Sequence, residues 1–226
     1  MAKILSNGAS NAKTKKNSRP TKILYLLPTE VDGKEMCPFA SAGCRAACLN
    51  TAGRGAMSSV QIARLKRTKK YVAQRAEFLA TIAQEINGTA KFYARKGQTV
   101  AIRLNGTSDQ PIVELLIKSH GIHANVEFYD YTKNPKKAGT KYLPSGHKYV
   151  ITFSREEHNE AKAIEVLKAG GNAAVVFNEL PKTWNGFKVI DGDERDDLML
   201  DYSGVVLGLK AKGKARQDKS GFVVIN

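Results

Sequence analysis

Short apolar runs alternate with longer amphipathic segments along most of this chain, and this alternation limits its fold more than any other feature. Such runs are typical of strands that are buried on both faces of a parallel sheet. They comprise residues 22–28, 99–104, 126–131, 149–153, 173–177, 188–190 and 204–209. Strands that alternate with helices are joined by right-handed crossovers, which predicts an α/β sheet covered on both faces. We therefore expect a partial or distorted (β/α) barrel of about seven mostly parallel strands.

Helices are expected between these strands. The longest covers residues 58–95, where apolar side chains recur at three- and four-residue steps and form one stripe. The stripe consists of Ile62, Leu65, Val72, Ala76, Leu79, Ala83 and Ile86. Asn87–Gly88 is a possible break that would divide this region into two helices. Shorter helices are expected at residues 111–119 and 159–169.

The first twenty residues show no periodicity and are rich in Asn, Lys and Ser. We therefore expect residues 1–20 to form a flexible basic arm, and residues 21–226 to form a single domain. No apolar run is long enough to span a bilayer, and the start of the chain lacks the apolar segment of a signal peptide. These features predict a monomer without a membrane partner that resides in a cytoplasm, where thiols stay reduced.

The chain carries a formal net charge of +15, which is high for 226 residues. Two cation clusters stand out: Lys3, Lys13, Lys15, Lys16, Arg19 and Lys22, then Arg64, Lys66, Arg67, Lys69, Lys70 and Arg75. One interpretation is a solvated face that keeps the protein soluble. The other is a surface that binds nucleic acid without sequence preference, or an acidic host protein.

All three cysteines lie within one twelve-residue window, at Cys37, Cys44 and Cys48. An odd number of cysteines in a reducing compartment argues against a closed disulfide framework. A structural zinc site usually has four ligands, often from paired C-x2-C motifs, and neither feature is present. Three thiolates in a loop rich in small residues instead favour a [4Fe–4S] cluster whose fourth iron is left open. The remaining alternative is that the cysteines are buried as small hydrophobic residues.

Ligands of barrels and open α/β sheets bind at the carboxyl ends of the strands. The candidate binding residues at these ends are Arg103, Asn105, Thr107, Ser108, Asp130, Asn178 and Lys210. Arg103 interrupts an apolar strand, and a buried guanidinium requires an anion beside it. It would either donate to the cluster sulfurs or pair with Asp130 or Glu179. Arg103 and Lys210 are expected nearest the open iron, where they favour a small anion or a carboxylate as its ligand.

Three other sequence patterns give weaker evidence for a functional site than the cysteines do. Residues 191–197 resemble a calcium loop but lack its late glutamate, so we expect a solvated turn. Residues 154–158 are typical of a helix N-cap with glutamate in the first turn. A histidine could supply a fourth metal ligand only through the fold, and we expect that none does. The candidates are His120, His123, His147 and His158.

Three segments carry a resemblance to a known family: LLPTEVDGKEMCPFASAGCRAACLNTAGRG, RLNGTSD and DYSGVVLGLKAKGKAR. They resemble a bacteriophage family of the gene-product-88 type, and this likeness covers most of the chain. The cysteine loop after the first strand also resembles the radical S-adenosylmethionine (SAM) superfamily. Ala47 stands where those enzymes have an aromatic residue, and no Gly-Gly-Glu-like segment follows the second strand. The resemblance therefore implies cluster binding rather than SAM chemistry.

Two classes of function follow from these expectations, and no catalytic residue is assigned in either. In the first, the open iron binds a substrate or SAM and the protein is a redox enzyme in a phage-infected host. In the second, the protein is an electron carrier, or a sensor that modulates host nucleic acid or protein. A structural zinc protein is the further alternative.

Overall fold

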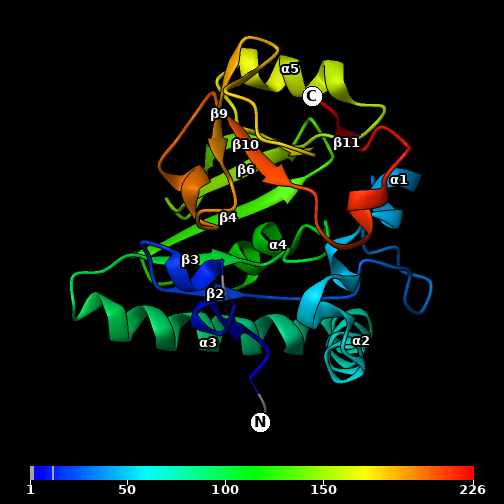
Figure 1. Cartoon of the computed structure of the whole chain (residues 1–226). Coiled ribbons are helices and arrows are strands. Elements are labelled where there is room, and N and C mark those ends of the chain that lie inside the picture. The colour runs from blue at the N-terminus through cyan, green and yellow to red at the C-terminus, as the bar shows by residue number, and fades with distance from the viewer. Residues whose placement is uncertain (1–2, 12) are drawn as a thin grey trace.

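A computed structural model describes residues 3–11 and 13–226, and its centre is an eleven-stranded, mostly parallel sheet (Figure 1). The strands are β1 (Ser6–Asn7), β2 (Thr21–Ile23), β3 (Val100–Arg103), β4 (Val126–Thr132), β5 (Gly139–Tyr142), β6 (Lys148–Ser154), β7 (Ala173–Phe177), β8 (Thr183–Trp184), β9 (Phe187–Asp191), β10 (Val206–Lys210) and β11 (Val223–Val224). The α-helices are α1 (Ala42–Ala46), α2 (Ser58–Ala73), α3 (Arg75–Ala94), α4 (Ile112–Ser119) and α5 (Glu160–Lys168). The strand order along the main path is β1-β2-β3-β4-β6-β7-β10-β9-β8.

The sheet is open, so the expected barrel does not form. β1 pairs antiparallel with β2 at one end of the path, and β8 pairs antiparallel with β9 at the other. β6 and β7 share only two paired positions, Phe153 with Ala173 and Ser154 with Ala174. Beyond that short contact, β5 lies along β6 and β11 lies along β7. The mostly parallel α/β sheet is confirmed, whereas a closed or nearly closed barrel of about seven strands is not.

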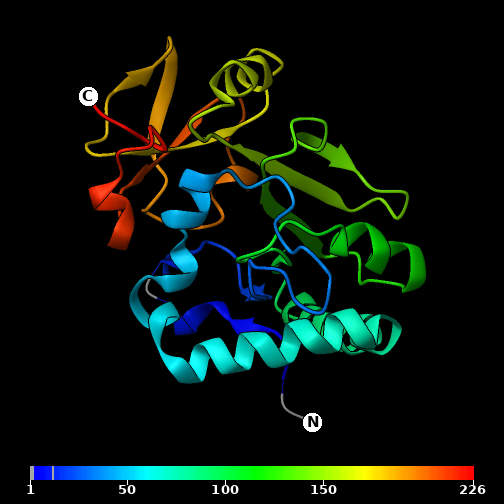
Figure 2. The same ribbon diagram turned by 90° about the vertical axis from the view of Figure 1, so that its right-hand side faces the viewer.

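Helices cover one face of the sheet and irregular segments cover the other (Figures 1 and 2). On the helical face, α3 and α4 pack against β3 and β4, and α5 packs against β7. On the opposite face, Leu198, Met199 and Leu200 pack against Tyr129 of β4 and Val150 of β6. Because side chains alternate along a strand, Arg103, Tyr129 and Tyr131 share this second face, and Asp130 points to the helical face.

The N-terminal segment packs against the domain and is not a separate arm. Ile4 and Leu5 are buried, and their backbone N–H groups donate to the carboxylate of Glu85 over 2.7 and 3.0 Å. Further along, Lys13 forms an ion pair with Asp196. The apolar pair and these charged contacts explain why a segment of basic composition is ordered here. Residues 1, 2 and 12 of the expected arm lie outside the described residues.

The long helical region breaks at Gln74, and not at Asn87–Gly88. Gln74 has φ −131° and ψ 50°, which separates α2 from α3, whereas Asn87 and Gly88 lie inside α3. The predicted stripe is confirmed in α3 for Leu79, Ala83 and Ile86, which are buried, but not for Ala76, which is exposed.

The stripe is wrong in α2, whose buried face is partly polar. Ile62 and Leu65 are 53% and 37% exposed, and the buried residues of the helix are Arg64, Thr68 and Tyr71. The Thr68 hydroxyl accepts a hydrogen bond from the backbone N–H of Leu27 over 2.9 Å. Polar contacts to the loop after β2 therefore help to orient this helix, with Ile62 and Leu65 left outside and Tyr71 and Val72 packed against the core.

Within the described residues, no helix combines the length and apolar character needed to cross a membrane.

Candidate functional site

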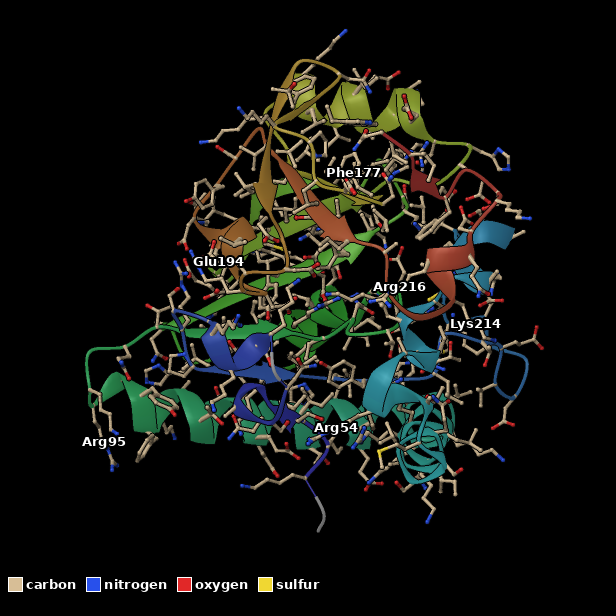
Figure 3. All side chains as sticks on the ribbon, viewed as in Figure 1. Arg54, Arg95, Phe177, Glu194, Lys214 and Arg216 are labelled. Atoms are coloured by element: carbon tan, nitrogen blue, oxygen red, sulfur yellow. The ribbon has the colours of Figure 1, made fainter. Side chains whose placement is uncertain are left out.

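The cysteine loop, residues 35–52, lies across the carboxyl ends of several parallel strands. Its Met36 carbonyl accepts a hydrogen bond from the backbone N–H of Asp109, which lies after β3. Ser41 donates to Glu156, which lies after β6, and Ala52 lies against Gly213, which lies after β10. Figures 1 and 2 show α1 beside the red C-terminal segment, and Figure 3 shows Lys214 and Arg216 on that segment. The loop is therefore placed where the sheet topology predicts a binding site.

The three thiols share one neighbourhood. Burial raises the pKa of Cys37 to about 12, and the nearby Cys48, Asp109 and Cys44 contribute to this rise. Burial also raises the pKa of Cys44, an effect that Lys133 opposes and Cys48 reinforces. At neutral pH, Cys37 and Cys44 are thus neutral thiols in the absence of a bound cation, which makes them poor nucleophiles.

Within residues 3–11 and 13–226, no three His, Cys, Asp or Glu side chains form a group that could hold one metal ion. The ligands of a single zinc ion converge on one point. Ligands of a cubane cluster bind different iron atoms, so they need not converge so closely.

A buried polar network holds the start of the loop. The Gln110 side chain donates to the carbonyl oxygens of Glu35 and Met36 over 2.9 and 3.1 Å. Asn105 accepts a hydrogen bond from the Gln110 backbone N–H and donates to Asp130 through its own backbone N–H over 2.8 Å. The predicted residues Asn105 and Asp130 therefore support the site from the helical face of the sheet.

Burial raises the pKa of Asp130 to about 7, which makes a specific pH dependence testable. A raised folded-state pKa contributes stability at low pH that is lost as pH rises from about 4 to about 7. Asp130→Asn removes this titration, so its free energy of unfolding should fall less between pH 5 and pH 8 than that of the wild type. We expect a difference of about 1–3 kcal/mol, measured by urea unfolding. Asp32→Asn, at an exposed position, is the control, and parallel slopes for the Asp130→Asn variant and the wild type would contradict the assignment.

Charged residues after β6 hold α1, which carries Cys44. The Glu157 carboxylate accepts hydrogen bonds from the Ser41 hydroxyl and the Gly43 backbone N–H, both over 2.8 Å. Ser41 in turn caps α1 by accepting from the Cys44 backbone N–H over 3.1 Å. A Cβ at Gly43 would lie within 3 Å of the Glu157 carboxylate and the Ser220 hydroxyl, so a larger residue there would require both side chains to shift. The expected helix N-cap at residues 154–158 is not formed, because α5 has Asn159 at its N-cap, and Glu157 instead binds the start of α1.

Lys133, at the end of β4, is the cation beside Cys44. Its side chain is 10% exposed, lies near the Cys44 thiol, whose pKa it lowers, and donates to Ser154. It also forms an ion pair with Glu156 over 3.5 Å. Asp109 lies near Cys37, but its carboxylate is occupied by the Thr132 hydroxyl and the Lys133 backbone N–H. These hydrogen bonds orient the Asp109 carboxylate so that it does not serve as a further ligand of a group bound by the cysteines.

Asn50 and α2 support Cys48. The Asn50 backbone N–H donates to the Cys48 Sγ over 3.5 Å. Gln61 and Arg64, one turn apart on α2, both donate to the Asn50 carbonyl oxygen, over 2.8 and 3.1 Å. Arg64 also donates to the Asn50 side chain.

Arg103 does not contact the cysteines, Asp130 or Glu179. It forms a double hydrogen bond with Asp196 over 3.0 and 3.1 Å and lies 4.6 Å from the ring centre of Tyr131. The expected turn at residues 191–197 is present, but it is solvated only in part, because Asp196 and Asp197 are buried. Their partners Arg103, Arg19 and Arg195 compensate the cost of burial.

The other predicted site residues divide into two groups. Thr107 and Ser108 lie at the loop, where the Thr107 carbonyl oxygen accepts from Cys37 Sγ over 3.7 Å and Ser108 donates to Asn105 over 2.9 Å. Asn178 is exposed and binds the C-terminal residue Asn226, and Lys210 is exposed with its backbone N–H on Asp193. The latter two therefore do not join the cysteines.

The histidines lie away from the thiols. His123 and His147 precede β4 and β6, at the amino ends of strands whose carboxyl ends face the cysteine loop. The ring of His147 interacts with Ser145 and the His123 carbonyl, and the ring of His120 with Ser119. His158 is nearer to the loop, but its side chain is 79% exposed and lies 3.9 Å from Glu157.

Sequence reasoning places Lys133 among the polar residues at the strand ends but misses Arg64, Gln110 and Glu157 as supporting residues. The available signal was position, because Gln110 and Glu157 each follow a predicted parallel strand. Arg64 had no such signal, because it was assigned to a solvated basic helix.

Fold and site together define an α/β protein in which a loop with three cysteines lies at the carboxyl edge of a large, mostly parallel sheet. The chain belongs to the Gene product 88 family, whose family model matches residues 3–225. No curated protein and no solved structure matches the chain. The resemblance to the gene-product-88 type is thus confirmed, and the comparisons give no support to the one with radical SAM enzymes.

Proposed function

We propose that this protein binds a [4Fe–4S] cluster through Cys37, Cys44 and Cys48 and leaves one iron open to an exogenous ligand. The observation that carries the proposal is the shared neighbourhood of the three thiols at the carboxyl ends of the strands. The bound group would supply one-electron redox chemistry, or an electrophilic iron for a small anion or carboxylate. The residues of this chain would hold it, shield it and balance its charge.

The chemistry of the surroundings supports this proposal. A cluster held by thiolates is an anion, and donors near its sulfurs stabilise it. The site provides the backbone N–H of Asn50 at Cys48 and the ammonium of Lys133 at Cys44.

The open iron is supported by the absence of a suitable fourth ligand in the described part of the chain. The carboxylate of Asp109 is occupied by hydrogen bonds, and three of the histidines lie toward the opposite edge of the sheet. With Arg103 paired to Asp196 and Lys210 exposed, Lys133 is the cation best placed to attract an anionic ligand.

Anaerobic purification tests the proposal. The protein should contain iron and acid-labile sulfide in equal amounts and show the broad visible absorption of sulfur-to-iron charge transfer. An EPR signal of the reduced protein that changes when a small carboxylate is added would identify the open iron. A colourless protein with one tightly bound zinc ion would instead identify the structural alternative. A cluster that responds to no added ligand would favour an electron carrier.

A second candidate function is binding of nucleic acid by the outer face of α2, which is favoured by one observation. No acidic residue occurs between Glu35 and Glu77, whereas this segment carries eight Lys and Arg residues. Of the cations on α2, Lys66 and Lys69 are exposed, while Lys70 pairs with Glu77 over 2.7 Å.

The double variant Lys66→Glu/Lys69→Glu tests this second function. A phosphate that the protein no longer neutralises keeps its counterions, so binding to a short fluorescent duplex should weaken by about tenfold or more and depend less steeply on salt. Lys168→Glu/Lys182→Glu, which makes the same change at exposed positions elsewhere, should retain binding. Affinity that is indifferent to salt, or equal weakening in both variants, would contradict a nucleic-acid surface on α2.

A further inference from the structure

Arg64 is a buried cation without a carboxylate partner. Only 7% of the residue is exposed, and no ion pair joins it to a carboxylate among residues 3–11 and 13–226. The other two inward-facing arginines are paired, Arg103 with Asp196 and Arg155 with Glu160, each over 3.0 Å. Burying an unpaired charge is costly, so the position of Arg64 requires another source of negative charge.

The surroundings of Arg64 contain one such source. Its guanidinium lies 5.2 Å from the ring centre of Tyr25, and one nitrogen, Nη1, is held by Asn50. Its Nε atom is buried without a hydrogen-bond partner. Asn50 links Arg64 to the cysteine site, because it accepts hydrogen bonds from Arg64 and its own backbone N–H donates to the Cys48 Sγ over 3.5 Å. A phenol is neutral near pH 7, so a group bound at Cys48 is the source of negative charge in this neighbourhood.

We propose that Arg64 is the counter-charge of the cysteine site, compensating the negative charge at Cys48 and raising the reduction potential of a cluster bound there. The inference rests on the proposed function, because the negative charge arrives with the bound group. Arg64 acts as a positioning residue, since it also fixes Asn50, whose N–H donates to Cys48. Lys133 does not replace it, because Lys133 lies at Cys44 rather than at Cys48.

Three variants test this role: Arg64→Gln, Arg64→Lys and, as a matched control, Arg67→Gln. Arg67 lies one turn after Arg64 on α2 and donates to the carbonyl oxygen of Tyr25 over 3.4 Å. Its pKa is shifted by burial and by Glu85, and not by Cys48. Iron, sulfide and the midpoint potential are measured on each protein prepared anaerobically. In Arg64→Gln we expect the reduction equilibrium to shift at least tenfold toward the oxidised form, which lowers a one-electron potential by about 59 mV. Arg64→Lys and Arg67→Gln should remain close to the wild type.

An unchanged potential in Arg64→Gln would overturn the inference, and so would an equal shift in Arg64→Lys, which would indicate a role of shape rather than charge.

If Arg64→Gln retains no iron, thermal unfolding of the metal-free proteins decides. Equal or higher stability of the variant supports the inference, because an unpaired buried charge has been removed. Lower stability shows a structural role and overturns it. A wild-type protein without iron and sulfide would refute the proposed function itself, which is a different result.

Discussion

Replacing Cys37, Cys44 or Cys48 singly by Ser should remove most of the iron and sulfide from the anaerobically prepared protein. Each thiolate would bind a different iron atom of the cluster, so no remaining residue can take its place. The effect should exceed the loss of about 10–100-fold in affinity that follows removal of a supporting residue. Iron and sulfide analysis with the visible absorption spectrum measures it.

Ala46→Ser is the matched control for these variants. It introduces the same side chain between Cys44 and Cys48 at an exposed position of α1, and it should retain the cluster. If one cysteine variant kept wild-type iron and sulfide, that cysteine would not be a ligand and the proposed three-thiolate site would be wrong.

Asp196→Asn should destabilise the fold by about 3–5 kcal/mol at pH 7, because it leaves two buried or half-buried cations without their partner. Arg103 and Lys13 both pair with Asp196, and the Tyr129 hydroxyl donates to it over 3.0 Å. The double variant Arg103→Leu/Asp196→Asn should recover part of the loss, since it removes the principal unpaired charge. Urea unfolding measures both effects. Glu165→Gln is the control, because it breaks an exposed pair with Lys162 and should cost less than about 1 kcal/mol.

The same ion pair gives a pH dependence of known sign. Burial acts to raise the pKa of Asp196, but Arg103 and Lys13 hold it well below its usual range. A depressed folded-state pKa contributes stability above about pH 4 that is lost as pH falls. The wild type should therefore lose more stability between pH 5 and pH 3 than Asp196→Asn does. Parallel loss in the two proteins would show that Asp196 does not carry this ion pair.

Local sequence patterns predicted the main helices and strands well where the apolar residues of the pattern lie in the core. The runs at β3, β4, β6, β7, β9 and β10 are strands, and α4 and α5 begin and end within one residue of their expected bounds. The missed strands β1, β5, β8 and β11 are short or antiparallel, and of these only β11 lies in an apolar run, at residues 222–225. β8 and β11 are only two residues long, and they pair because neighbouring strands bring an unsatisfied edge to them.

The sequence alone predicts the parallel α/β class and the order of its strands along the chain. It also shows that the three cysteines follow the first of these strands closely. These depend on contacts close in sequence, or on the rule that parallel strands present their carboxyl ends at one edge. Only the tertiary structure decided which charges meet. Arg103 pairs with a residue 93 positions away, whereas Arg64 turns inward to Asn50 from a helix whose composition indicated a solvated face. Ion pairs and hydrogen bonds across such separations leave no periodic trace in a sequence, because the same side chains serve equally well on a surface.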